Sequence, residues 1–426
     1  MKREKKGKAV VVGGSIGGVS CAHALVAAGW EVLVLEKSAA PPTGSPTGAG
    51  LGLDPLAQRL IDSWVGATHL LRDATVPLTI DLNQATDGEK KVSWTLTRDE
   101  NFNFRAAHWA DLHSLLYNAL PPSIFLWGHL FLSLCTSGEN AGIKIKAKVL
   151  QTNETVEIAG DLLVAADGCL SSIRKIFLPD LKLRYSGYCA WRGVLDFSDN
   201  ENSEIITGLQ KAYPDLGKCL YFDLGYRTHV VLYELPNKRM NWIWYVGQPE
   251  PQIQRNSVTT KVSRDMIEAM LKEAEKVWAP ELVKVMKATK EPFINIIYDC
   301  EPPEQVFWGN LVLVGDAAHP TTPHGVRSTN MSLLDAAVLG KCLEKWGAEN
   351  LHSALEEYQS IRVPVTTKQV LHSRRMGRIK QGLVLPDRRA FDPMTASPGE
   401  CEELQHKNMP FFSHVPAIVE SLARCS

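Results

Sequence analysis

The hydrophobic pattern near the start of the chain predicts a strand, a helix and a second strand. Two continuous apolar runs, Ala9 to Val12 and Val32 to Leu35, flank a stretch with small and apolar residues at helical spacing. Runs of this kind without alternation are typical of parallel strands that are covered on both faces. The same apolar pattern returns at residues 310–319, so this segment is expected to join the same sheet.

The middle of the chain follows a different pattern. From 183 to 250, aromatic and β-branched residues alternate with polar ones, which predicts a largely antiparallel sheet in a second domain. Residues 124–168 are expected to form a β-meander. Helices are predicted at 109–119, within 263–290, and from 329 to about 382.

Composition places the chain among ordinary folded proteins with more than one core. It has 426 residues, of which 45% are hydrophobic and 22% charged, and this length is about three times that of a typical domain. The 46 basic and 47 acidic residues give a net charge of −1, which argues against nucleic acid and anionic membranes as partners.

Cysteine usage and the apolar runs predict a cytoplasmic location. The nine cysteines include no C-x-x-C pair, so neither a metal site nor a disulfide framework is expected. Only eight mostly charged residues precede the first apolar run, and this leaves no room there for a cleavable signal. The run at 124–135 is too short to cross a bilayer, so no stable membrane insertion is expected.

A glycine-rich loop between the first strand and helix predicts a dinucleotide site. Glycines there allow a tight turn and let backbone amides approach a pyrophosphate. Glu36 ends the second strand, where a carboxylate can accept hydrogen bonds from a ribose. The predicted contacts are Gly13, Gly14, Ser15, Gly17, Gly18, Glu36 and Lys37, with Ser15 standing where the usual motif has its second glycine.

Two later segments, 161–174 and 309–320, each end a predicted strand with a carboxylate and a glycine. Asp167-Gly168 and Gly315-Asp316 resemble the Asp-Gly and Gly-Asp motifs of the class A flavoprotein aromatic hydroxylases. The resemblance covers about 350 residues and assigns these four residues to FAD. A simpler alternative for each aspartate is a turn residue that caps the next helix.

The resemblance implies an α/β fold with a Rossmann-like FAD-binding domain, a mainly antiparallel substrate domain and a helical C-terminal region. It implies an FAD-dependent monooxygenase that uses NAD(P)H transiently and hydroxylates an electron-rich aromatic or heteroaromatic molecule with O₂ through a flavin C4a-hydroperoxide. The expected boundaries are 1–70, 105–182 and 292–355 for the FAD domain, 71–104 and 183–291 for the substrate domain, and 356–426 for the rest.

Two loops are expected beside the flavin, and the chain departs from the family pattern in one of them and at one other position. Gly50 belongs to a small-residue loop beside the expected flavin, and the segment from Pro323 to Ser328 has fewer glycines than its family counterpart. Trp109 stands where the family usually has an FAD-contacting arginine. In the later loop, Pro323, His324, Gly325, Val326 and Arg327 are expected at the flavin, whereas His319 and His324 are weighed as acid or base and neither is assigned that role.

The aromatic strands supply the candidate substrate contacts. Motifs at 185–193 and 241–245 look most like the 2,6-dihydroxypyridine 3-monooxygenase-like subgroup of the family. Side chains alternate along a strand, so Trp242 and Trp244 share one face while Ile243 and Tyr245 share the other, and only one pair can line a pocket. The tryptophans are the favoured pair, and the predicted substrate contacts are Tyr221, Tyr233, Trp242 and Trp244.

Two alternatives remain open at this point. Trp242-Ile-Trp244 is similar to a signature of flavin-dependent halogenases, although the continuation differs. The altered loop and Trp109 are also compatible with a non-catalytic flavin-fold binding protein. The sequence predicts no metal site and does not indicate an oligomeric state.

Overall fold

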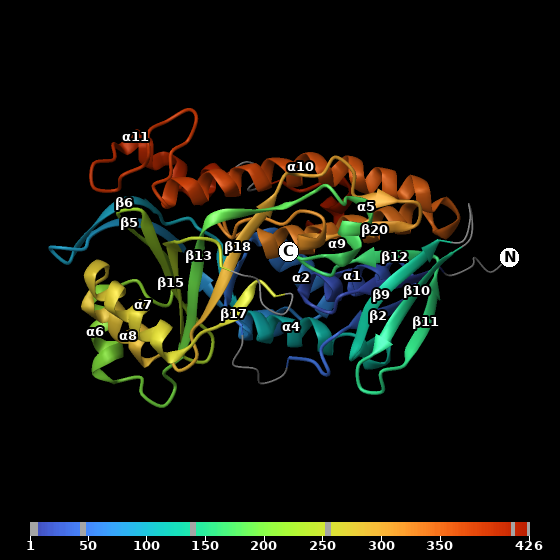
Figure 1. Ribbon diagram of the computed structural model, residues 1–426, viewed down its shortest axis with the longest axis horizontal. Helices are drawn as coiled ribbons and strands as arrows, with labels where there is room; N and C mark the ends of the chain where they lie inside the picture. The colour runs from blue at the N-terminus through green and yellow to red at the C-terminus, as the bar shows by residue number, and fades with distance from the viewer. Residues whose placement is uncertain (1–6, 43–47, 137–141, 252–256, 410–413, 424–426) are drawn as a thin grey trace.

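The computed structural model describes residues 7–42, 48–136, 142–251, 257–409 and 414–423 (Figure 1). Two large sheets lie at opposite ends of an elongated molecule, and one long helix spans them along one side. None of the described helices is long and apolar enough to cross a membrane.

The first large sheet has six strands, and its neighbours are parallel except for the pair at one edge. This arrangement confirms the predicted Rossmann-like core, including the return of the late apolar run. In spatial order the strands are β19 (Phe307–Trp308), β20 (Leu311–Leu313), β12 (Leu162–Ala165), β1 (Lys8–Val12), β2 (Glu31–Glu36) and β8 (Phe125–Trp127).

Close helix packing covers this sheet. Helix α1 (Ile16–Ala27) lies against β1 because Gly18 has no side chain; a Cβ there would stand 1.8 Å from the Gly13 carbonyl oxygen. Helix α9 (Ser328–Trp346) also approaches α1 closely at Gly340, where a Cβ would meet Ala24 at 2.8 Å. The remaining helices around this half are α2 (Pro55–Val65), α3 (Thr68–Asp73), α4 (Trp109–Asn118), α5 (Ser172–Phe177) and α12 (Glu420–Ala423).

The second large sheet has eight strands and is mainly antiparallel, as predicted, with one parallel pair between β14 and β5. In spatial order the strands are β17 (Thr259–Lys261), β18 (Phe293–Cys300), β13 (Leu183–Asp196), β16 (Arg239–Gly247), β15 (Thr228–Leu235), β14 (Cys219–Gly225), β5 (Ile80–Asp87) and β6 (Val92–Asp99). Strand β18 belongs here, so the second sheet extends beyond the expected boundary at 292.

The two faces of the eight-stranded sheet have different neighbours. One face carries a core that includes Trp242 and Trp244 and is covered by α6 (Glu204–Ala212), α7 (Arg264–Val277) and α8 (Pro280–Ala288). The other face carries Tyr233 and Tyr245 in a separate core. That second core also receives residues from the end of α10 and from the segment after it.

Two small sheets and the C-terminal helices complete the fold. Helix α10 (Leu351–Lys380) runs along the top of Figure 1 from the six-stranded sheet to the eight-stranded one, and α11 (Pro398–Cys401) lies beyond its end. The small sheets are β3 (Gly50–Leu53), β7 (Phe104–His108) and β4 (Thr75–Leu78), and β11 (Thr155–Gly160), β10 (Ile143–Val149) and β9 (His129–Thr136).

Candidate active site

The glycine loop forms a backbone cradle at the start of α1. Gly13 has a φ of +108°, which favours glycine, and a Cβ on Gly14 would lie 2.9 Å from the Glu36 side chain. The first turn of α1 has no acidic residue, and the exposed Ser15 makes no capping bond with its side chain. The cradle therefore leaves helix N-terminal amides open, as a pyrophosphate site requires.

Glu36 pins this cradle from the end of β2. One carboxylate oxygen accepts from the Gly14 amide at 2.8 Å, and the other accepts from the amide and hydroxyl of Ser38. Two carboxylate oxygens offer about four acceptor positions, so capacity remains for ribose hydroxyls. The neighbouring Lys37 is exposed.

Helix α4 contributes a contact that the sequence reasoning missed. The His113 ring donates from Nε2 to the Gly14 carbonyl oxygen at 2.7 Å and lies beside Trp109, with ring centroids 5.6 Å apart. Burial lowers the pKa of His113. Trp109 and His113 thus stand at the cradle, in the region where the family pattern places its arginine.

Asp167 acts locally as a helix cap. Its carboxylate accepts from the Ser171 hydroxyl at 2.5 Å, and from the amides of Ser172 and Ile173 at the start of α5. These hydrogen bonds stabilise the turn that contains Asp167 and the start of α5, which is the role of a turn residue that caps the next helix. Gly168, with a φ of +81°, makes that turn.

Arg174 connects the two carboxylate motifs. Its buried guanidinium donates to the carbonyl oxygens of Cys169, Asp316 and Ala317 at 2.5 to 3.1 Å. The Asp-Gly segment thereby holds the Gly-Asp turn in place. The sequence analysis assigned Arg174 no role.

Asp316 faces a cavity from the turn at Gly315–Ala317. One carboxylate oxygen accepts from the Ser328 hydroxyl at 2.9 Å, and no described residue donates to the other. Burial raises the pKa of Asp316, and hydroxyl donors from a ligand would favour its ionised form. The open oxygen suits the hydroxyl chain of a cofactor.

His319 lies outside the described cavity wall and supports the Gly315 turn. Its Nε2 donates to Asp335 at 2.5 Å, and the same carboxylate accepts from the Gly315 amide and from Arg362 of α10. Burial opposes ionisation of Asp335, but His319 and Arg362 lower its pKa to about 2. This buried network gives His319 a structural role.

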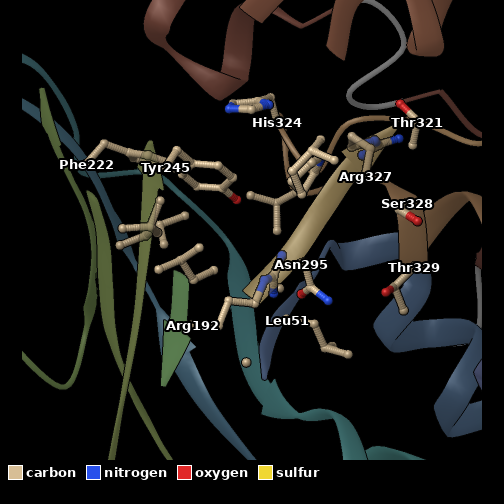
Figure 2. Close-up of a pocket in the computed structure, with 18 of the residues that line it drawn as sticks. Leu51, Arg192, Phe222, Tyr245, Asn295, Thr321, His324, Arg327, Ser328 and Thr329 are labelled. Carbon is tan, nitrogen blue, oxygen red and sulfur yellow. The ribbon is translucent and has the colours of Figure 1, made fainter. Parts of the chain in front are cut away.

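The cavity lies between the Asp316 turn and the second sheet and has a volume of about 310 Å³. Figure 2 shows its wall, with Tyr245 and Phe222 on one side and Arg327, Ser328 and Thr329 on the other. The sequence-predicted residues that line it are Gly50, Tyr233, Asp316, Pro323, His324, Val326 and Arg327.

The predicted tryptophan pair is corrected by the structure. Trp242 and Trp244 lie in the core beneath α7 and α8, where their indole nitrogens donate to Thr289 and Thr228. The other pair, Ile243 and Tyr245, lines the cavity. The same alternation places Phe222 at the wall and Tyr221 in the opposite core.

The loop at 323–328 is held by a buried ion pair. Arg327 Nη1 donates to Asp54 Oδ2 at 2.6 Å, and Asp54 also caps α2 by accepting from the Ala57 amide. Asn330 donates to the carbonyl oxygens of Gly52 and Val326. Val326 has a φ of +58°, which is unfavourable for a β-branched residue, so these contacts hold a strained loop.

A chain of neutral polar groups extends from His324. Its Nδ1 lies 3.3 Å from the Tyr188 hydroxyl, and its Nε2 lies 3.3 Å from Nε2 of His229. The other ring nitrogen of His229, Nδ1, lies 3.0 Å from the Gln381 side-chain nitrogen. Burial lowers the pKa of both histidines well below 6.5. Both rings are therefore uncharged at neutral pH.

Comparisons with known proteins show which enzymes the chain is similar to. Residues 301–373 match the FAD binding domain family. The chain is 25% identical to 6-hydroxynicotinate 3-monooxygenase of Pseudomonas fluorescens, over 84% of its own length and 88% of the relative's. It is 28% identical to 3-hydroxybenzoate 6-hydroxylase of Klebsiella oxytoca, over 87% of this chain and 88% of the relative.

The solved structure of 2,6-dihydroxypyridine-3-hydroxylase from Arthrobacter nicotinovorans has the same fold, with a TM-score of 0.75 at 20% identity over 91% of this chain and 97% of that one. In sequence and in fold, the chain is therefore similar to FAD-dependent aromatic hydroxylases.

Proposed function

We propose that this enzyme inserts one atom of O₂ into an electron-rich aromatic or heteroaromatic ring, with NAD(P)H as the reductant. The balanced reaction consumes the ring compound, O₂, NAD(P)H and a proton, and yields the hydroxylated ring, NAD(P)⁺ and water. The observation that carries the proposal is the cavity where the Asp316 turn meets the aromatic face of the second sheet.

The residues present fit FAD along an extended path. The glycine cradle would receive the pyrophosphate, Glu36 the adenosine ribose and Asp316 the ribityl hydroxyls. Bound FAD supplies the electron transfer from NAD(P)H and the reaction with O₂. The chain's own residues bind it, orient it and shape the space around its ring.

The loop from Pro323 to Arg327 would set the position of the flavin edge. The Asp54 pair and Asn330 restrain this loop, so its backbone amides present a fixed surface. Tyr233, Tyr245 and Phe222 would hold a flat ring opposite it and exclude water.

The cavity also bears on the substrate and on the halogenase alternative. Its volume of about 310 Å³ suits a small molecule, and its aromatic wall suits a ring like those named for the relatives. The tryptophan pair behind the halogenase alternative faces the opposite core, which does not support that alternative. The described cysteine side chains are free thiols, which supports the cytoplasm as the proposed location.

The test is substrate-stimulated oxidation of NADH and NADPH by the FAD-loaded protein across phenols, hydroxybenzoates and hydroxypyridines. We expect at least one ring to accelerate cofactor oxidation and to gain a single atom from isotopically labelled O₂. Asp316→Asn should lose FAD affinity, because an amide replaces the open acceptor with a less basic one. Tight FAD binding without stimulation by any ring would favour the non-catalytic alternative.

A further inference from the structure

The cavity wall carries one cationic side chain that no described residue neutralises. Arg192 extends from β13 into the cavity, and its Nε is buried without a hydrogen-bond partner. No ion pair or hydrogen bond joins its guanidinium to the described part of the chain. The other lining arginine, Arg327, is paired with Asp54.

The remaining polar groups of the wall do not balance this charge. His229 and His324 are neutral because burial lowers the pKa of each, and Asp316, which accepts from Ser328 on its own turn, forms no ion pair with Arg192. An unpaired charge at a partly buried site is unfavourable, and a complementary ligand charge relieves that cost.

Strand pairing gives Arg192 a polar neighbour in a rigid setting. Ala190 pairs with Asn295, and Arg192 pairs with Phe293. Arg192 and Asn295 therefore project from the same face of the sheet as diagonal neighbours on adjacent strands. The Asn295 amide nitrogen donates to Thr259 at 2.7 Å, which fixes its orientation and leaves its second N–H free to donate. Both groups line the cavity.

We infer that Arg192 binds a carboxylate carried by the aromatic substrate, with Asn295 as a second donor, and that it makes the enzyme select ring anions over neutral rings of the same shape. The planar guanidinium matches a carboxylate through paired hydrogen bonds. The ring itself would then lie against Tyr245 and Phe222. This inference rests on the proposed function in one respect, namely that the bound ring compound is the substrate.

The test uses the FAD-loaded protein and two probes, benzoate and benzamide, which share a ring and a planar substituent but differ in charge. Binding is read from the flavin absorbance. We expect benzoate to bind at least about tenfold more tightly, as expected for a hydrogen bond to a charged group. Arg192→Gln should weaken benzoate about 10- to 100-fold and leave benzamide and FAD affinity nearly unchanged. Arg192→Lys should restore part of the preference.

The matched control is Arg98→Gln, which removes the same charge from an arginine of β6 that is paired with Glu100 and Asp215 outside the cavity. It should keep the full preference for benzoate. Equal affinity of the wild-type protein for both probes would overturn the inference, as would an unchanged preference in Arg192→Gln. A loss of FAD with an unchanged probe ratio would assign Arg192 to the cofactor instead.

Because binding is measured without turnover, the two claims fail separately. Selective benzoate binding without NAD(P)H-dependent hydroxylation would overturn the proposed function alone. Hydroxylation of neutral rings with no role for Arg192 would overturn this inference alone.

Discussion

Tyr245 and Trp244 are adjacent in the chain, yet their side chains serve opposite faces of β16. The Tyr245 ring stacks on His229 with centroids 4.4 Å apart, and its hydroxyl has no partner among the described residues. The Trp244 indole donates to Thr228 at 2.8 Å inside the helix-covered core. One strand thus supplies a binding surface and a packing surface.

This difference predicts opposite effects of two conservative changes. Tyr245→Phe should weaken the binding of a polar aromatic substrate by about fivefold, the worth of one hydrogen bond, with little change in stability. Trp244→Phe should lower the free energy of unfolding by about 1–3 kcal/mol and leave binding unchanged. Ligand titration and denaturant unfolding of both variants measure the two effects, and a binding defect in Trp244→Phe would contradict the assignment of faces.

A side chain at Gly52 should clash with Val326, and a smaller residue at position 326 should relieve the clash. A Cβ there would lie 2.5 Å from Cγ1 of Val326, so Gly52→Ala must displace the loop at 323–328. We expect it to lower the free energy of unfolding by about 1–3 kcal/mol, as overpacking does. In a Val326→Ala background the penalty should largely disappear, because the opposing methyl group is absent. Denaturant unfolding of the four-member cycle measures the coupling, and an additive result would show that the loop does not rest on Gly52.

At the scale of elements, the loop at 323–328 shows how a segment with few glycines is fixed. This chain joins the loop to the start of α2 through Asp54 and Arg327. Both side chains are nearly buried, at 5% and 6% exposed. The loop therefore depends on a charge pair that is sensitive to the loss of one partner.

Arg327→Leu should lower the free energy of unfolding by about 3–5 kcal/mol, because it leaves the Asp54 carboxylate buried and unpaired. Adding Asp54→Asn should recover part of that loss, since asparagine still caps α2 but carries no charge. Denaturant unfolding of both variants is the measurement. No recovery in the double variant would show that Asp54 is stabilised by groups other than Arg327.

The sequence predicted the elements well and their contacts less well. Continuous apolar runs identified the parallel core because burial on both faces leaves a direct signal in the chain. Period-two alternation showed that Trp244 and Tyr245 face opposite ways, but which face meets the cavity depends on the packing of helices α6 to α8, which the pattern of the strand itself does not show. Asp54 was missed because its partner, Arg327, lies 273 residues away.

At the scale of the whole molecule, α10 links both halves. In its first half Arg362 bonds to Asp335 behind the Gly-Asp turn, and at its end Lys380 lies over the Phe222 ring, 3.3 Å from the centroid. Burial lowers the pKa of Lys380 to about 7, although nearby Asp81 opposes that shift. A buried lysine of this kind makes stability depend on pH.

The sign of this dependence follows from proton uptake. Between pH 7 and the usual lysine value of 10.5, the unfolded chain holds a proton on Lys380 that the folded protein does not. Stability from this group therefore rises with pH across that window, by up to about 1.4 kcal/mol per pH unit. Lys380→Met should be most stabilising relative to wild type near pH 7 and lose that advantage toward pH 10.

Denaturant unfolding at a series of pH values measures the difference, and Lys368→Met, at an exposed position on the same helix, is the control. A constant difference between Lys380→Met and wild type across the window would show that Lys380 does not change its protonation there.

The reach of α10 and of the segment after it also bears on how the protein is made. His406 bonds to Asp81, a residue of β5 that leaves the ribosome 325 residues earlier, and Gln381 reaches His229 across 152 residues. During synthesis the cavity-side face of the second sheet therefore stays uncovered until the end of α10 and the segment after it have been made. Such non-local closure makes folding slow and exposes apolar surface to aggregation. Production of active enzyme should consequently respond to chaperones and to the pace of translation more strongly than the stability of the finished protein would suggest.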